Sequence, residues 1–158
     1  MNLYYKDIAN KNIAGSIDRL QNLVNTIPVL LRQIPDNEFS YKLTPEVWSK
    51  KEIMGHLIDS ATNNHQRFIR IQYENNPVIG YGQNEWNALS GYNQMGSNHV
   101  IDFWSLYNQH LINILRQIPN ESLGKTGLLT DGKEMPLAWY INDYVAHLEH
   151  HLRDVVAY

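Results

Sequence analysis

The chain has 158 residues, a length that suits one domain, and its 13 basic and 16 acidic side chains give a formal net charge of −3. This balance offers no basic stripe for nucleic acid, and no run of about 18 apolar residues is present that could span a membrane. The first twelve residues show no signal-peptide pattern, so we expect a soluble cytoplasmic protein.

Cysteine is absent, whereas histidine occurs seven times. The lack of cysteine excludes disulfide scaffolds, thiolate zinc fingers, iron–sulfur clusters and cysteine nucleophiles. Any transition-metal site must therefore be built from imidazole and carboxylate groups.

The first helical pattern covers residues 13–34, where apolar side chains recur in alternating steps of four and three. Pro28 falls inside this pattern, and we expect it to kink the helix or break it in two. The second pattern covers residues 49–73. It begins with Ser49 and Glu52, which fit a capping box.

The third helical pattern covers residues 100–118, with Ser97 or Asn98 as the expected N-cap. The fourth covers residues 137–155, and Pro136 stands where a proline in the first turn is tolerated. Steps of four and three suit an internal core, and they would equally suit the packing of two subunits.

The connections between these patterns are unequal in length. Residues 74–96 form a long link that holds Tyr81, Trp86 and Tyr92, and links of this length are often functional. This link could cover a pocket or simply pack over one end of the helices. The Asp131-Gly132 pair in the last link favours a tight turn and suits a short hairpin. We predict an all-α fold, a four-helix bundle with long connections, as one domain over residues 1–158.

Three histidines occupy positions from which they could bind one metal ion. His147 and His151 are four residues apart, so they lie on one face of the fourth helix. Both belong to a stripe with Tyr144 that borders the apolar stripe, whereas His150 points away. His56, next to an apolar position of the second helix, could supply a third ligand. The alternative is that all three are polar residues at the edge of the core.

A polar row lies on the same face as His56, and the remaining histidines do not fit a site. Asp59, Ser60, Asn63 and Arg67 follow His56 at helical spacing. They form either a solvated helix face or the wall of a polar pocket, in which Asp59 could orient a ligand histidine or carry a proton. We expect the last three histidines to be on the solvated surface: His65, His99 and His110.

Two segments resemble a known family. WSKKEIMGHLIDS (residues 48–60), continued by NNHQRF (63–68), resembles the second-helix signature of the DinB/YfiT-like proteins, and DYVAHLEHHL (143–152) resembles their fourth-helix signature. The resemblance implies a four-helix bundle that holds a divalent nickel, zinc or iron ion. Carried over by position, the ligands would be His56, His147 and His151.

The resemblance also implies a class of activity. Members of this family include thiol S-transferases that use low-molecular-weight thiols, as well as isomerases and hydrolases of small molecules, and many are homodimers. We therefore expect a metal-dependent enzyme that activates water or a thiol, with a small-molecule substrate and no nucleic-acid or membrane partner. The expected pocket residues are Asn63, Arg67, Tyr81, Trp86 and Tyr144. The alternative is a bundle that binds a metal or small molecule, or pairs with a partner, without catalysis.

Overall fold

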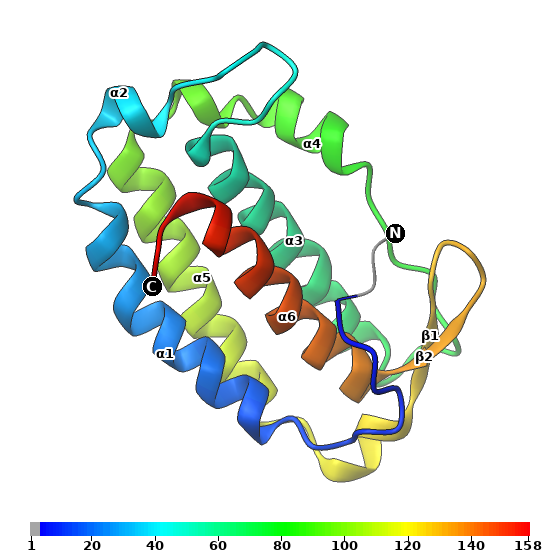
Figure 1. Ribbon diagram of the computed structural model, residues 1–158. Helices are drawn as coiled ribbons and strands as arrows, with labels where there is room; N and C mark the ends of the chain where they lie inside the picture. Colours follow the sequence, from blue (N-terminus) through cyan, green and yellow to red (C-terminus); the bar gives the residue numbers. More distant parts are fainter. Residues whose placement is uncertain (1–3) are drawn as a thin grey trace.

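The computed structural model describes residues 4–158, and four long helices form its framework (Figure 1). The expected all-α fold is confirmed. Between the long helices lie two short helices, two 3₁₀ turns and one small hairpin. The long helices are α1 (Ala14–Leu31), α3 (Lys50–Arg70), α5 (Ser97–Leu115) and α6 (Leu137–Val155).

The four long helices pack in a ring in which α3 and α1 lie diagonally opposite each other. Both α3 and α1 pack against α5 and against α6. Apolar side chains from all four helices meet along the middle of this ring as one core, and Leu20, Leu57, Leu111 and Leu148 are fully buried there. The alternating steps of four and three in the sequence therefore mark faces that point into the bundle.

Neighbouring helices run in an uncommon combination of directions. The Ser16 hydroxyl donates to Asn142 Oδ1, and Arg19 pairs with Glu149 at 3.0 Å, so α1 and α6 are parallel. The α3 and α5 helices are also parallel, because Lys51 donates to the Met95 carbonyl oxygen at 3.0 Å near their starts. Further along the same pair of helices, His65 and Tyr107 are in contact. Taken in chain order, α1, α3, α5 and α6 therefore run up, down, down and up.

The parallel pair of helices explains the long connection. A chain that leaves the end of α3 must return along its whole length before α5 can begin. The returning segment passes beside the hairpin of β1 (Thr126–Leu128) and β2 (Glu134–Pro136), then forms α4 (Gln83–Ser90) and the 3₁₀ turn η1 (Tyr92–Gln94) (Figure 1). The expectation of a hairpin is confirmed, and Gly132 at its turn has a φ of 85°.

One helix end is as the sequence predicted, and two others differ from the prediction. The capping box of Ser49 and Glu52 is present at the start of α3. The expected side-chain cap of α5 is wrong, because Gly96 is its N-cap and the Ser97 hydroxyl instead donates to Asp36. Pro136 is the N-cap of α6 rather than a residue of its first turn.

The first helix is continuous through its proline, so of the two expected outcomes, a kink or a break, the break is wrong. Pro28 lies in the last turn of α1, where only Val24 can lose a backbone partner, and α1 ends at Leu31 rather than at Ile34. Two shorter helical pieces complete the chain: α2 (Asp36–Phe39) and η2 (Asn120–Gly124). Within residues 4–158, no helix combines the length and the apolar character needed to cross a membrane.

Candidate metal centre

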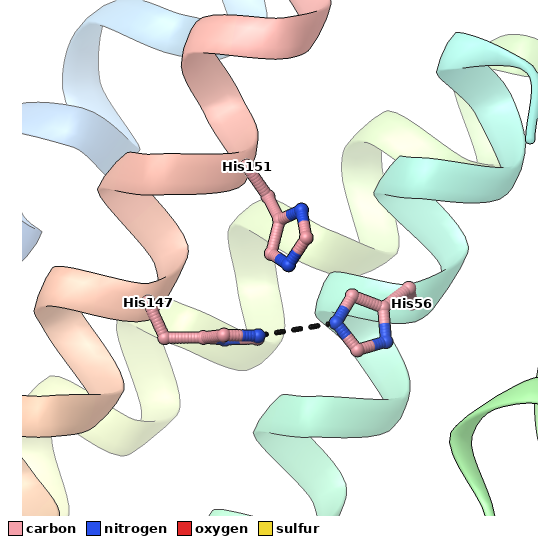
Figure 2. Close-up of side chains that lie close together, drawn as sticks. All are labelled: His56, His147 and His151. Carbon is pink, nitrogen blue, oxygen red and sulfur yellow. Dashed lines mark hydrogen bonds between the residues drawn. The ribbon is translucent and has the colours of Figure 1, made fainter. Parts of the chain in front are cut away.

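Three imidazole rings from α3 and α6 converge on one point (Figure 2). Because these helices are antiparallel, the first half of α3 carries His56 to the second half of α6, where His147 and His151 lie one turn apart. One ring nitrogen from each of the three histidines lies within 4.8 Å of the other two. The Nε2 atoms of His56 and His147 are only 3.2 Å apart.

This spacing fits a bound metal ion. Imidazole nitrogens bind zinc at about 2.0–2.1 Å, and two ligands at a tetrahedral angle are then about 3.3–3.4 Å apart. The 3.2 Å between the Nε2 atoms of His56 and His147 is close to this value. Nitrogen donors of this kind also suit nickel and iron.

The opposite nitrogen of each ring faces a different group. The Tyr81 hydroxyl lies 3.4 Å from Nδ1 of His56, and the Ser60 hydroxyl lies 3.4 Å from Nδ1 of His147. Asp154 Oδ2 is 3.9 Å from Nδ1 of His151. Groups at Nδ1 orient a ligand ring and leave Nε2 for the metal.

The histidines are held in the neutral form that binds metals. Burial, with a smaller effect of His151, lowers the pKa of His56 to about 4. Burial, followed by the neighbouring His56 and His151, lowers the pKa of His147 to about 2. Burial and the nearby His150 also lower the pKa of His151. A neutral imidazole has a lone pair to donate, so these shifts favour metal binding near neutral pH.

Two of the three histidines, His56 and His147, line a cavity of about 550 Å³. His56, Ser60 and Arg67 line it from α3, and Tyr144 and His147 line it from α6. The returning segment closes a further side with Gly80 and Tyr81 and with Gln83 at the start of α4. A cavity of this size suits a small molecule.

The polar row on α3 is buried rather than solvated. Asp59, Ser60, Asn63 and Arg67 are each at most 7% exposed, which excludes the interpretation of a solvated helix face. Ser60 and Arg67 line the cavity, whereas Asp59 and Asn63 lie outside its lining. Of the five predicted pocket residues, the structure brings Arg67, Tyr81 and Tyr144 to the cavity.

Asp59 is placed differently from the expectation that it orients a ligand histidine. Its Oδ1 accepts a hydrogen bond of 2.6 Å from the Tyr92 hydroxyl. Its Oδ2 is buried, and no group within residues 4–158 donates a hydrogen bond to it. Burial raises the pKa of this carboxyl group, and the bond from Tyr92 opposes that shift. The Nδ1 partners of the histidines are other residues, so the orienting role is wrong, while a role as proton carrier remains a prediction.

The aromatic residues of the long connection have separate roles. Tyr81 lines the cavity, and Trp86 packs beside it with ring centroids 5.1 Å apart while staying 39% exposed. Tyr92 is buried against Gly55 of α3. The expected cover is therefore formed by Tyr81 and its neighbours, with Trp86 outside them.

The other histidines lie away from the site. His99, His110 and His150 are exposed, as expected. His65 differs from these three because it is half-buried, and its Nδ1 lies 2.9 Å from the Tyr107 hydroxyl. The expectation of a solvated side chain is therefore wrong for His65. The rings of Tyr107 and His110 on α5 pack edge-on against its ring.

Sequence reasoning missed several residues at the site, among them two aromatic side chains and one acid. Tyr4 lines the cavity and packs its ring edge-on against His147, with centroids 4.9 Å apart. Asp143 also lines the cavity and accepts hydrogen bonds from the backbone N–H groups of Tyr4 and Tyr5. Trp48 packs against His56, with the two ring centroids 5.1 Å apart. Both aromatic residues lie outside the regular helical patterns, so spacing could not have assigned them to the site.

Comparison with solved structures identifies the same bundle elsewhere. The chain superposes on YfiT of Bacillus subtilis with a TM-score of 0.80 at 19% identity, covering 96% of this chain and 89% of that one. YfiT is described as "a probable metal-dependent hydrolase with an unusual four-helix bundle topology". A mycothiol-dependent maleylpyruvate isomerase matches with a TM-score of 0.68 at 12% identity, over 89% of this chain and 60% of that one.

Comparison by sequence gives the family. A Bacillus cereus protein named "Putative metal-dependent hydrolase" is 24% identical over 155 residues, which cover 98% of this chain and 89% of that protein. A Bacillus anthracis protein of the same name matches equally well. The sequence profile of the DinB superfamily matches residues 17–155. The chain therefore belongs to the DinB superfamily.

Proposed function

We propose that the protein is a metal-dependent enzyme that acts on a small molecule, with a divalent ion held by His56, His147 and His151. The observation that carries this proposal is the convergence of three neutral imidazoles, two of which line a cavity of about 550 Å³. When bound, such an ion lowers the pKa of a water or thiol that reaches it and so supplies a nucleophile near neutral pH.

The residues around the histidines have supporting tasks in this proposal. Tyr81 and Ser60 fix the rings of His56 and His147 through their Nδ1 atoms. Tyr81 and Tyr144 shape the cavity around the substrate. Asp59 is the candidate proton carrier, since its Oδ2 has no donor within residues 4–158 and its charge acts on the hydroxyl of Tyr81.

The nucleophile is either water or a low-molecular-weight thiol. The names of the Bacillus relatives favour hydrolysis, while the maleylpyruvate isomerase neighbour is named as mycothiol-dependent, which favours a thiol. Because the chain has no cysteine, a thiolate in this reaction would have to come from a bound molecule. Hydrolysis of ester and lactone panels, compared with thiol addition to an electrophile such as monobromobimane, separates the two reactions.

The first test is the metal content of the purified protein. We expect wild-type protein, prepared without chelators and offered zinc or nickel, to hold about one ion per chain. His56→Ala and His147→Ala should lose most of this metal because each removes one of three ligands. His110→Ala, which removes an exposed histidine on α5, is the matched control and should keep it. Wild-type protein without stoichiometric metal, as measured by elemental analysis, would refute the proposed function and leave a bundle that binds partners without catalysis.

The proposal includes a cytoplasmic homodimer. Exposed apolar side chains on α5 support subunit pairing, since Phe103 is 47% exposed and Leu106 is 71% exposed. Sedimentation of the wild type should give the mass of two chains, and Leu106→Glu should shift it toward one.

A further inference from the structure

Arg67 is a buried cation in the wall of the cavity, and its guanidinium donates three hydrogen bonds to neutral oxygen atoms. Its Nε and Nη2 both donate to the Ile79 carbonyl oxygen, at 3.0 and 2.8 Å, and its Nη1 donates to Asn64 Oδ1 at 3.3 Å. A guanidinium carries five N–H groups, so these bonds leave one on Nη1 and one on Nη2. Each of the two terminal nitrogens therefore keeps one donor, and a carboxylate can accept from both of them.

No carboxylate within residues 4–158 forms an ion pair with this guanidinium. The charge of Asp143 acts on it, but the Oδ1 atom of that residue already accepts the backbone N–H groups of Tyr4 and Tyr5. The Tyr140 ring lies 5.2 Å from Arg67 Cζ and contributes a cation–π contact. Arginine is rarely buried to 7% exposure without a counter-ion, because an unpaired buried charge is costly.

The guanidinium shares its cavity with the histidines. Arg67 follows His56 by eleven residues on α3, which separates their Cα atoms by about 16 Å along the helix axis. Side chains on a helix lean toward its N-terminus, so the long arginine side chain shortens this separation. Its charge also acts on His147. One small molecule in the cavity can therefore reach both groups.

We propose that Arg67 binds a carboxylate of the substrate, so that the substrate class is a small organic acid held at a fixed distance from the atom that reacts at the histidines. This inference rests on the proposed function and names the class of molecule that the site accepts. The carboxylate would supply the missing counter-charge and receive the two remaining N–H groups.

A purely structural role for Arg67 makes a different prediction. Its bonds to Ile79 fasten the returning segment to α3, and this task requires donors but no anion. A structural clamp would affect all ligands of the cavity equally, whereas a carboxylate-binding residue would affect only those that carry the acid.

The test uses cobalt-loaded protein and a series of thiol ligands. The ligands are mercaptopropionate, mercaptohexanoate and mercaptooctanoate, each compared with its neutral amide. Binding is followed by the thiolate-to-cobalt charge-transfer absorption, which does not require turnover. In the wild type we expect the best acid to bind at least about tenfold more tightly than its amide. The chain length of that acid measures the distance from the histidines to Arg67.

Variants of two arginines on α3 complete the design. Arg67→Gln should bring the acid-to-amide ratio close to one while leaving the affinity of the amide nearly unchanged. Arg67→Lys, which keeps the charge and loses the paired donors, should give an intermediate ratio. Arg70→Gln is the matched control, because Arg70 pairs with Glu74 outside the cavity at 2.7 Å, and it should keep the wild-type ratio.

The outcomes separate this inference from the proposed function. If cobalt does not bind, the proposed function fails. If cobalt and thiols bind but acids and amides bind equally in the wild type, the carboxylate site is refuted while the metal site stands. This comparison needs only the wild type, so it decides the question even if the Arg67 variants do not fold. A ratio that survives in Arg67→Gln would also overturn the inference.

Discussion

At the scale of single residues, the three histidines differ in how firmly they are held. His56 is 1% exposed and packs against Trp48, whereas the side chain of His151 is 19% exposed and has only Asp154, at 3.9 Å, near its Nδ1 atom. His151 is therefore the ring that solvent reaches most easily. A carboxylate near Nδ1 makes the ring a stronger electron donor, which offsets its looser position.

Asp59 provides a prediction on pH, because its carboxyl group is buried and its Oδ2 atom has no donor within residues 4–158. Burial raises its pKa in the folded state, so the folded protein keeps this proton after the unfolded chain has lost it. The carboxyl group therefore favours folding at low pH, and this advantage is lost as the pH rises from about 3.8 through the folded-state pKa.

Asp59→Asn cannot titrate and should escape this loss. We expect the melting temperature of the variant, relative to the wild type, to rise with pH above about 4 and then level off. A difference on the order of 1 kcal/mol corresponds to about 2–4 °C for a chain of this size. Thermal unfolding followed by circular dichroism between pH 4 and 8 measures it, and a difference that stays constant over that range would contradict the assignment.

At the scale of elements, the segment between α3 and α5 decides where the cavity can form. Two parallel neighbours cannot be joined by a short turn, so residues 71–96 must travel back beside the bundle. Arg67 fastens this segment at Ile79, and η1 anchors its far end through Tyr92. The segment that the topology requires is thus also a wall of the cavity.

The contact between η1 and α3 depends on a glycine. A Cβ atom on Gly55 would lie 2.1–2.2 Å from two ring carbons of Tyr92, which is far inside van der Waals contact. We expect Gly55→Ala to displace Tyr92 and to lower the free energy of unfolding by about 1–3 kcal/mol. Urea denaturation measures the change.

Gly15→Ala is the matched control for this substitution. Gly15 also lies in a helix, and a Cβ atom there would have no neighbour within 4 Å. Alanine favours the helical conformation over glycine, so this variant should gain up to about 1 kcal/mol. If both variants change stability in the same direction, the close approach of Tyr92 is not the cause.

The sequence predicted the long helices because their buried faces repeat with helical spacing, and Ser49 with Glu52 marked one helix start through a local hydrogen-bond pattern. The sequence did not predict α4. The eight residues of this helix bury only Asn87, so they show no apolar periodicity. The expected cap at Ser97 was wrong because the Ser97 hydroxyl binds Asp36, which is distant in the sequence. Local patterns cannot reveal such a competing partner.

In the candidate site, too, some residues could be predicted from local patterns and others could not. The helical positions of His56, His147 and His151 could be read from spacing, since a helix fixes which side chains share a face. Tyr4 and Asp143 came together only through the fold, where the start of the chain crosses α6. The position of Tyr81 likewise depends on the path of the returning segment, which no local pattern specifies.

At the scale of the whole molecule, a bound ion would join two helices that are far apart in the sequence. His56 is on α3 and the other two ligands are on α6, so the ion would bind the folded chain and not the unfolded one. Zinc or nickel at about 100 times its dissociation constant should stabilise the fold by about 2.7 kcal/mol. This corresponds to a rise in melting temperature of roughly 5–10 °C.

Addition and removal of metal test this prediction. A chelator should return the melting temperature of the wild type to its metal-free value, and His147→Ala should show almost no response to metal. Scanning calorimetry measures both. An equal rise in the wild type and in His147→Ala would place the binding at other groups, such as the exposed His150 and Asp154.

The arrangement of the four helices also affects how the sequence of such a protein can change in evolution. The histidines are on two long helices whose positions the core fixes, whereas Gly80 and Gln83 belong to a stretch, residues 72–91, that contributes no side chain to the core cluster. Exchange of this connection can therefore reshape one side of the cavity without moving the imidazoles. If the histidines hold the proposed ion, proteins built on this bundle could keep the same three ligands and still differ in the molecules that they accept.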